Sequence, residues 1–297
     1  MNNFIPKARL SRRDFLKLLG VSGLGVMVSA AGYSIIGQNE ADWLDVSQVR
    51  LVLPRLPRKF SGVRIVQVSD FHLGSWMNGK RLQQVFSVLK ELKPDVVTIT
   101  GDIVLGSKHE STLPQQLDEM EVELKDLTRS CPVLSVMGNH EYWYNTSSVM
   151  RMLRRGRVQS LVNDVVSVHA GTENLYFAGI DDLIAGQPNL EELLSKLPAE
   201  GCVILLSHEP DFADKSAATG RFDLQISGHS HGGQVNLPLI GPPVLPEMGR
   251  KYPNGLYRVG SMYQYTNRGV GMTPPNVRIN CRAEITVFTL ESPRSGT

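Results

Sequence analysis

Five short polar clusters, each directly after an apolar run, constrain this chain of 297 residues more than any other feature. The apolar runs are rich in valine, isoleucine and leucine, and amphipathic helical patterns alternate with them, which predicts parallel βαβ units. Ligands of such folds bind beyond the carboxyl ends of the strands. We therefore expect the clusters to lie along one rim of an α/β fold. They are residues 69–72, 101–102, 138–141, 207–208 and 228–231.

The expected elements follow this alternation. The first half predicts strands over 46–53, 63–68, 96–100 and 132–137 and helices over 82–92 and 117–127. The second half predicts strands over 175–180, 203–206, 224–226, 257–259, 263–266 and 283–290 and a helix over 189–197. A glycine- and proline-rich loop, 237–255, interrupts the later strands.

The side chains at issue in the clusters are aspartate, asparagine and histidine, which are ligands of hard or borderline divalent metals. No cysteine lies in any cluster, and this disfavours a structural zinc or iron–sulfur site. A single aspartate after a strand is more often a cap, and a lone histidine such as His109 or His169 is more often structural. Together and in order, they indicate a hydrolase that uses metal-bound water. The candidate ligands are Asp70, His72, Asp102, Asn139, His208, His229 and His231.

Asp102 is the natural bridge of a dinuclear site, because a carboxylate can bind two cations that lie about 3.5–4 Å apart. Asn139 offers only a neutral carbonyl oxygen, which preserves the Lewis acidity of its metal. Histidine ligands bind in the neutral form, so metal affinity should fall at acidic pH. Manganese, iron or zinc would suit this ligand set.

The charge distribution does not support a nucleic-acid footprint on the main domain. The whole chain carries a net charge of +2, but five basic residues and one acidic residue within the first seventeen positions give +4 there. The remainder therefore carries −2, which is not a basic binding surface. The cysteines Cys131, Cys202 and Cys281 are scattered and odd in number, so no disulfide framework is expected.

The first 37 residues have the layout of an export signal. Basic residues precede an uncharged stretch at 18–37, and the pair Arg12 and Arg13 resembles the twin-arginine signal of bacteria. The stretch is about long enough to span a bilayer, so an uncleaved inner-membrane anchor is the alternative to cleavage. We expect the twin-arginine export machinery as a partner and a periplasmic or membrane-anchored location. Residues 38–44 would form a linker.

The joint pattern resembles the calcineurin-like metallophosphoesterases. Asp-x-His, Gly-Asp, Gly-Asn-His-Glu, His and Gly-His-x-His occur in that order, and the resemblance covers residues 45–292. It implies a four-layer α-β-β-α sandwich over this domain, followed by a disordered tail at 293–297. Similarity to the bacterial branch typified by the YaeI and YkuE phosphodiesterases is carried by 207–211, 228–234, 268–271 and 281–285.

The resemblance also implies roles for single residues. His140 matches the histidine that faces the leaving group, where it would donate a proton or stabilise charge. Glu141 would either orient His140 or favour a helix N-terminus. Leu105 stands where many relatives have an aspartate that is not a metal ligand. The first metal would be held by Asp70, His72, Asp102 and His231, and the second by Asp102, Asn139, His208 and His229.

The resulting hypothesis is a phosphodiesterase with two divalent metal ions. It would hydrolyse a phosphoester bond in the bacterial envelope by attack of metal-bound hydroxide. The alternative is a membrane-associated pyrophosphatase for a UDP-2,3-diacylglucosamine-type lipid in lipid A biosynthesis, whose cytoplasmic substrate conflicts with export. A third hypothesis is a non-enzymatic metal-binding protein, against which the complete ligand set argues.

Substrate contacts are less constrained by the sequence. Arg250 and Lys251 could position phosphate or diphosphate groups of the substrate, a phosphodiester or a lipid-linked phosphate, or could be solvated surface. The apolar part of the loop at 237–245 would either cover the edge of the core or form a lip for a lipid or membrane surface.

Overall fold

The computed structural model describes residues 43–106 and 111–293. The predicted export signal, the first five residues of the predicted linker and residues 294–297 of the predicted tail lie outside this part of the chain. None of the described helices is both long and apolar enough to cross a membrane.

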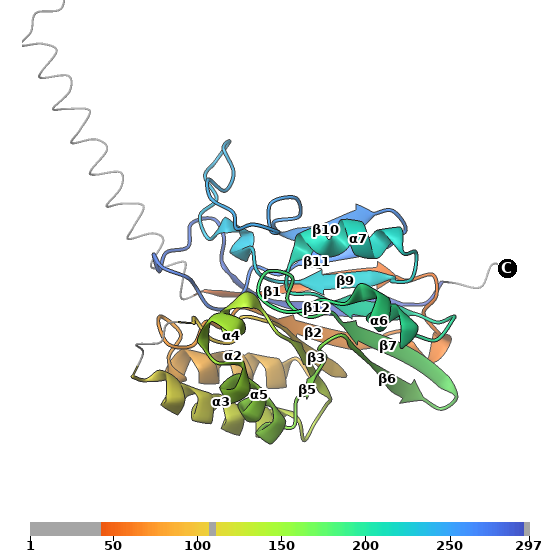
Figure 1. Ribbon diagram of the computed structural model, residues 1–297, viewed down its shortest axis with the longest axis horizontal. Helices are drawn as coiled ribbons and strands as arrows, with labels where there is room; N and C mark the ends of the chain where they lie inside the picture. Colours follow the sequence, from red (N-terminus) through yellow and green to blue (C-terminus); the bar gives the residue numbers. More distant parts are fainter. Residues whose placement is uncertain (1–42, 107–110, 294–297) are drawn as a thin grey trace, which may run out of the picture.

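Two six-stranded sheets pack face to face at the centre of the fold (Figure 1). In spatial order, the first sheet contains β1 (Leu44–Val52), β12 (Ala283–Glu291), β2 (Arg64–Val68), β3 (Val96–Thr100), β4 (Val133–Val136) and β5 (Gln159–Ser160). The second contains β10 (Gly255–Val259), β11 (Met262–Thr266), β9 (Leu224–Ser227), β8 (Val203–Leu206), β7 (Glu173–Gly179) and β6 (Asp164–Ala170).

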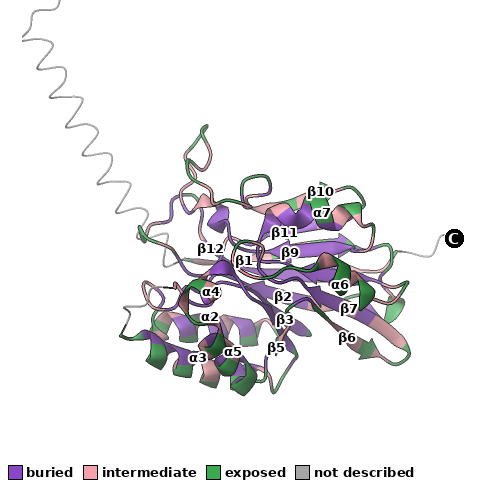
Figure 2. Ribbon diagram, viewed as in Figure 1, coloured by how far each residue is buried: buried purple, intermediate pink, exposed green. Residues whose placement is uncertain are grey.

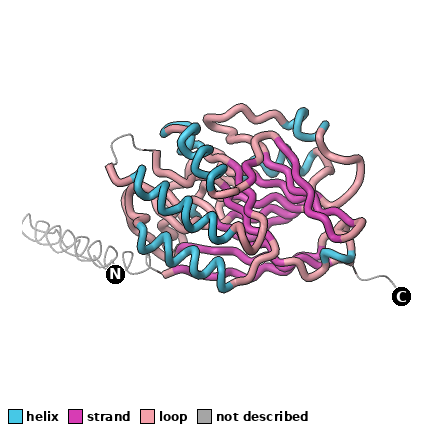
Figure 3. The backbone as a smooth tube through the Cα atoms, turned by 90° about the horizontal axis from the view of Figure 1, so that it is seen from below, coloured by secondary structure: helices cyan, strands magenta, loops and turns pink. Residues whose placement is uncertain are grey.

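Helices cover the outer faces of both sheets, which makes four layers. The longer helices lie side by side over the first sheet, as Figure 3 shows: α2 (Gly79–Glu91), α3 (Leu113–Leu127) and α5 (Thr146–Arg155). The second sheet is covered by α6 (Leu190–Ser195) and α7 (Ala213–Ala218). The short helix α4 (Asn139–Tyr144) and three 3₁₀ turns, η1 (Arg58–Phe60), η2 (Pro210–Phe212) and η3 (His231–Gly233), complete the described elements.

Alternate residues of the inner strands face different cores, as the period of two requires. In β3, Val97 packs under the long helices, whereas Val96 packs between the sheets. In β8, Ile204 lies between the sheets and Val203 packs under α6 and α7. The strands are apolar on both sides because both sides are covered, and the centre of the fold is buried (Figure 2). The four-layer α-β-β-α sandwich predicted from the sequence is confirmed.

Some element boundaries differ from those predicted. α3 begins at Leu113, four residues before the predicted start, because Pro114 occupies the first turn, where its missing N–H costs no hydrogen bond. β6 was not predicted, since its valines are only half-buried and do not form a clear apolar run. β1 pairs in parallel with β12, with Leu44 opposite Ala283, so the first and last described strands are neighbours.

The polar clusters lie where the sheet geometry predicts. β2, β3 and β4 run parallel, and so do β8 and β9. Each of these five strands ends within two residues of a cluster. The two sheets meet at this rim, where the ring of His208 bonds to the carbonyl of Thr100. The rim is therefore shared by both sheets.

Candidate metal centre and active site

The turns that follow the strands are tightly bent. Left-handed backbone is uncommon for residues other than glycine, typically costs about 1–3 kcal/mol, and is concentrated at functional sites. Here it turns the chain immediately beyond a strand and directs the polar side chains back over the rim. The candidate ligands in this conformation are Asp70 (φ 54°), His72 (φ 50°), Asp102 (φ 52°), His229 (φ 71°) and His231 (φ 52°).

The first set of side chains joins the ends of β2 and β9. His72 Nε2 lies 2.9 Å from His231 Nε2, and Asp70 Oδ1 lies 3.4 Å from the same His231 atom. All three side chains are buried. Two unprotonated ring nitrogens at this distance repel each other unless a proton or a cation lies between them. The set therefore fits a divalent cation, which histidine nitrogens and carboxylate oxygens bind together.

The second set joins β3, β4, β8 and β9. His208 Nε2 lies 3.1 Å from Asp102 Oδ2 and 3.2 Å from His229 Nδ1. The buried Oδ1 atom of Asn139 has no hydrogen-bond partner among the described residues. Buried polar atoms are rarely left unsatisfied, so this oxygen fits a ligand for a cation.

Asp102 lies between the two sets. Its Oδ2 atom is 3.7 Å from His72 Nε2 and 3.1 Å from His208 Nε2. Its Oδ1 atom accepts the backbone N–H of His140 at 3.1 Å. One carboxylate is thus within reach of both sets, which is the arrangement that a bridging ligand needs. The structure brings all seven predicted ligands together, and their metal-binding roles stay predictions.

Backbone carbonyls fix the orientation of two ligand rings. His208 Nδ1 donates to the Thr100 carbonyl at 2.7 Å, and His229 Nε2 donates to the Glu247 carbonyl at 2.7 Å. When these rings are neutral, the opposite nitrogens, His208 Nε2 and His229 Nδ1, present lone pairs towards the centre. Such outer contacts commonly fix the tautomer and position of metal-binding histidines.

The electrostatics follow from burial. Burial lowers the pKa of His72 to about 3 and that of His229 to about 4, which keeps both rings neutral and able to bind a cation. Burial also raises the pKa of Asp70 to about 7. For Asp102, burial works in the same direction, but the adjacent His208 and then His140 hold its pKa well below the ordinary value.

His140 is separate from the buried ligands. Its Nδ1 atom bonds to the Leu105 carbonyl, and its Nε2 atom lies 3.9 Å from Asp102 Oδ2. Its side chain is 16% exposed, whereas those of His72 and His208 are fully buried. This hydrogen bond uses the backbone carbonyl of residue 105, so it forms even though Leu105 replaces the aspartate of many relatives. His140 therefore faces the cavity as a group that could move a proton.

Glu141 holds the loop that carries Asp102. Its buried carboxylate accepts N–H groups from Asp102 (3.0 Å), Ile103 (2.6 Å), Val104 (3.2 Å) and Gly138 (2.7 Å). Burial, and then the charge of Asp102, raise the pKa of Glu141 to about 8, against the effect of these donors. The hydrogen bonds of Glu141 therefore go to the backbone around Asp102. One of the two expectations was that Glu141 orients His140, and no hydrogen bond joins these two side chains among the described residues.

Two glycines allow the strand ends to approach closely. A Cβ atom at Gly101 would lie 2.5 Å from His208 Nδ1, and one at Gly138 would lie 2.7 Å from the Asp102 backbone nitrogen. Real Cβ atoms do not approach so closely, so any larger residue would displace the candidate ligands. This explains the glycine before Asp102 and the glycine before Asn139.

A cavity of about 460 Å³ opens over these side chains. This volume is typical of small-molecule sites. No lysine or arginine lines the cavity within the described part of the chain. Its walls combine His72, Asp102, Asn139, His140, His229 and His231 with Trp143, Ser230, Gly233, Gln234, Val235, Pro243, Val244, Pro246, Thr273, Pro274 and Pro275.

The predicted substrate-binding residues Arg250 and Lys251 lie outside this cavity. Lys251 Nζ forms an ion pair with Asp214 at 2.7 Å. Arg250 lines a neighbouring groove with residues 242–245. Both could contact only a part of the substrate that extends beyond the cavity, and their role stays a prediction.

Sequence reasoning missed Trp143. Its ring lies 4.8 Å from that of His140, and it lines the cavity. The spacing of His140 and Trp143 could have indicated this contact, because residues three apart share one face of a helix and both lie in α4.

The comparison with known families decides what this site is. Residues 63–233 match the family described as calcineurin-like phosphoesterase. The chain belongs to the calcineurin-like phosphoesterase family. It is therefore a metal-dependent hydrolase of phosphoric esters, as predicted. The family is dimetal-dependent, in agreement with the two ligand sets around Asp102.

Relatives in this family match the chain over almost its whole length. The uncharacterized metallophosphoesterase YkuE of Bacillus subtilis is 34% identical over 291 residues, covering 96% of this chain and 99% of its own. The phosphodiesterase YaeI of Escherichia coli is 26% identical over 288 residues, covering 95% and 99%. Among solved structures, a dimetal phosphatase from Danio rerio is similar with a TM-score of 0.47 and 14% identity, over 72% of this chain and 90% of that one.

Proposed function

We propose that the protein is a phosphodiesterase that uses two divalent metal ions and acts on a phosphodiester of the bacterial envelope after export. The observation that carries this proposal is the position of Asp102 Oδ2, 3.7 Å from His72 Nε2 and 3.1 Å from His208 Nε2. When bound, two divalent cations polarise phosphoryl oxygens and lower the pKa of coordinated water. Manganese, iron and zinc suit these nitrogen and oxygen ligands.

The chain's own residues have distinct tasks in this proposal. The Leu105 carbonyl orients the ring of His140, so that Nε2 of the protonated ring can donate a proton to the leaving oxygen of the ester. Trp143 packs against the ring of His140 and limits the access of water to it. The metals would be held by Asp70, His72, Asp102 and His231 on one side and by Asp102, Asn139, His208 and His229 on the other.

The lining of the cavity favours a diester over a monoester. A phosphomonoester is a dianion near neutral pH, and enzymes commonly use lysine or arginine to bind such charge. The described wall of this cavity holds neither, and it includes Trp143 and several prolines. A diester carries one negative charge and a second organic group, which these apolar walls can accept.

Support for the location comes from the sequence. Arg12 and Arg13 precede the uncharged stretch at 18–37, which is the arrangement of a twin-arginine signal. We propose export by this route, followed by release into the periplasm or retention by an uncleaved anchor. Protease access in intact spheroplasts tests this, because a cytoplasmic domain would be protected.

The alternative substrate is a UDP-2,3-diacylglucosamine-type lipid, cleaved at its diphosphate. The apolar cavity mouth around Val244 supports a substrate with acyl chains. Protection of the domain in spheroplasts, together with cleavage of this lipid, would favour the alternative over the exported enzyme.

The decisive experiment is a substrate screen with the full-length protein loaded with manganese. We expect faster hydrolysis of bis(p-nitrophenyl) phosphate than of p-nitrophenyl phosphate. Metal analysis of the same sample shows whether the sites are filled. The absence of diester hydrolysis from protein that contains two metal ions would contradict the proposal.

A further inference from the structure

The loop beside the cavity exposes an apolar tip. Leu239, Ile240 and Val244 are 108%, 75% and 74% exposed, the highest values among large hydrophobic residues of the described chain. Single exposed hydrophobic residues are common on soluble proteins, but three within six positions form a patch. In Figure 1 the loop projects beyond the layers, in light blue near the top. We call residues 237–245 the apolar tip.

Local hydrogen bonds hold this tip in a defined shape. Leu237 and Gly241 exchange backbone hydrogen bonds of 3.0 and 2.8 Å, which closes a tight turn. Leu239, at its apex, has φ of 66°, a conformation that is unfavourable for leucine. The base is held by the bond from Asn236 N to the Ile279 carbonyl at 2.8 Å. These hydrogen bonds hold the tip in one conformation, in which the side chain of Leu239 is exposed.

The backbone of the tip has few free donors. Four of the ten residues from 237 to 246 are prolines, which have no N–H. Ile240 and Gly241 donate their N–H groups to the Leu237 carbonyl. Backbone donors that enter a lipid bilayer must be satisfied internally, whereas a protein partner could pair with them. The tip therefore suits lipid better than a polar protein surface.

A cationic side chain, Arg250, lies next to the apolar tip. Arg250 is exposed and shares a groove with residues 242–245. Its guanidinium has no hydrogen-bond or ion-pair partner within the described residues. An apolar projection next to an exposed cation suits a bilayer surface, which offers hydrocarbon to the apolar side chains and phosphate groups to the cation.

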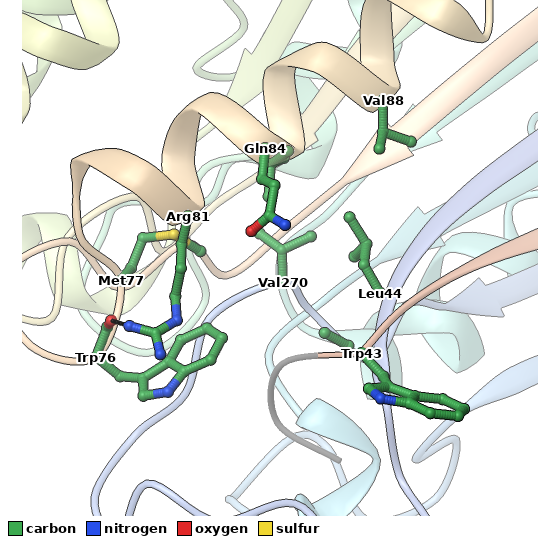
Figure 4. Close-up of a pocket in the computed structure, with 10 residues that line it drawn as sticks. Trp43, Leu44, Trp76, Met77, Arg81, Gln84, Val88 and Val270 are labelled. Atoms are coloured by element: carbon green, nitrogen blue, oxygen red, sulfur yellow. Dashed lines mark hydrogen bonds between the residues drawn. The ribbon is translucent and has the colours of Figure 1, made fainter. Parts of the chain in front are cut away.

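A second surface at the same rim has interfacial character. A separate cavity of about 190 Å³ is lined by Trp43, Trp76, Arg81 and Val270, among others. In Figure 4, Arg81 lies over the ring of Trp76 on one side of this cavity, and Trp43 lies beside Leu44 on the other. Trp43 is 58% exposed and follows the uncharged stretch 18–37 by six residues. Val270 lines this cavity and Thr273, three residues later, lines the catalytic cavity. The two cavities therefore lie at the same end of the sheets. Tryptophan is enriched at membrane interfaces.

We propose that the apolar tip inserts into the surface of a lipid bilayer and holds the catalytic cavity against phosphate-bearing headgroups. Val244 belongs both to the tip and to the cavity wall, so insertion places the cavity mouth at the membrane. The docking rests on geometry alone. Its consequence rests on the proposed function: the substrate is a phosphodiester presented at a membrane surface.

A site-specific probe tests the docking in the full-length protein. An environment-sensitive fluorophore is attached to Leu239→Cys, with Val122→Cys on α3 as the control, since Val122 is 65% exposed. The native cysteines are buried and so protected from labelling. In vesicles of phosphatidylcholine and phosphatidylglycerol, the probe at 239 should shift to shorter wavelength and be quenched by brominated lipid. The probe at 122 should do neither.

A probe at 239 that stays in water, or that responds no more than the one at 122, overturns the docking. So does shielding that appears without vesicles at high protein concentration, because it assigns the tip to a second copy of the chain. The proposed function is tested separately with soluble bis(p-nitrophenyl) phosphate. Failure of that hydrolysis alone would leave the docking in place.

A variant pair connects docking to substrate. Leu239→Asp with Ile240→Asp should lower hydrolysis of vesicle phosphatidylglycerol about 100-fold, since both apolar contacts with the bilayer are lost. It should leave hydrolysis of the soluble diester unchanged, as should Val122→Asp for both substrates. Equal losses on soluble and vesicle substrates would overturn the inference about the substrate.

Discussion

The buried carboxylate of Glu141 accepts the backbone N–H of Asp102 at 3.0 Å. The contact joins the first turn of α4 to the loop after β3. It fixes the backbone from which the predicted bridging ligand projects, although Glu141 itself is not a ligand candidate. The placement of the predicted ligand Asp102 thus depends on Glu141, which contacts the backbone of Asp102.

Glu141→Gln should destabilise the protein and weaken metal binding. The amide group turns a hydrogen-bond donor towards backbone N–H groups, and each N–H left without an acceptor costs about 1–3 kcal/mol. Metal affinity should fall about 10–100-fold, as for other residues that orient ligands. Urea unfolding and manganese titration measure the two effects. The exposed Glu91→Gln serves as control, and equal stability of the two variants would contradict the role.

Asp102→Asn should remove the bridge. An amide keeps the shape but loses the charge and one of the two binding oxygens. We expect at most one metal ion per chain by elemental analysis and a loss of turnover of about 10³-fold or more, because several kcal/mol of charge stabilisation disappear. The exposed Asp118→Asn should retain both metals. Full metal content in Asp102→Asn would show that the ligand sets do not share this residue.

His140→Ala should lower kcat while both metals remain bound. Loss of a general acid typically costs about 10²–10⁴-fold. The loss should be smaller for a nitrophenyl ester than for an alkyl ester, because nitrophenolate leaves without a proton. The control is His169→Ala on β6, which should have full activity because His169 is exposed. An equal loss on both esters would remove the proton-donor role and leave only electrostatic stabilisation.

Much of the fold could be predicted because its inner strands are unambiguous. Val96 and Val97 pack on opposite faces of β3 and are both apolar, so this run predicts a strand that is buried on both faces. β6 and α5 escaped prediction for the opposite reason. Most residues of β6 are half-buried, and α5 carries three arginines among ten residues, with only Val149, Met152 and Leu153 buried. Their place is set by tertiary contacts rather than by local pattern.

The candidate ligands could be predicted because each follows a strand directly, and parallel strands bring their ends together. The supporting contacts could not. That Glu141 binds the backbone of Asp102, or that the Glu247 carbonyl orients His229, depends on loops that fold back from distant positions. No spacing in the sequence encodes those contacts.

Metal binding should release protons below neutral pH. In the metal-free site, burial raises the pKa of Asp70 to about 7. Burial would lower the pKa of His208, but Asp102 raises it well above the ordinary value. Both groups therefore hold a proton at pH 6, and both must lose it to bind a cation. Protons compete with metal, so affinity should rise with pH through 7.

Calorimetric titration of manganese into chelator-treated protein measures this release. At pH 6, the heat should depend on the ionisation enthalpy of the buffer, with about two protons released when both sites fill. At pH 8, Asp70 is already ionised and the release should be smaller. Asp70→Asn should reduce the release at pH 6 by about one proton. Heat that is independent of buffer at pH 6 would mean that both groups are deprotonated before the metal arrives.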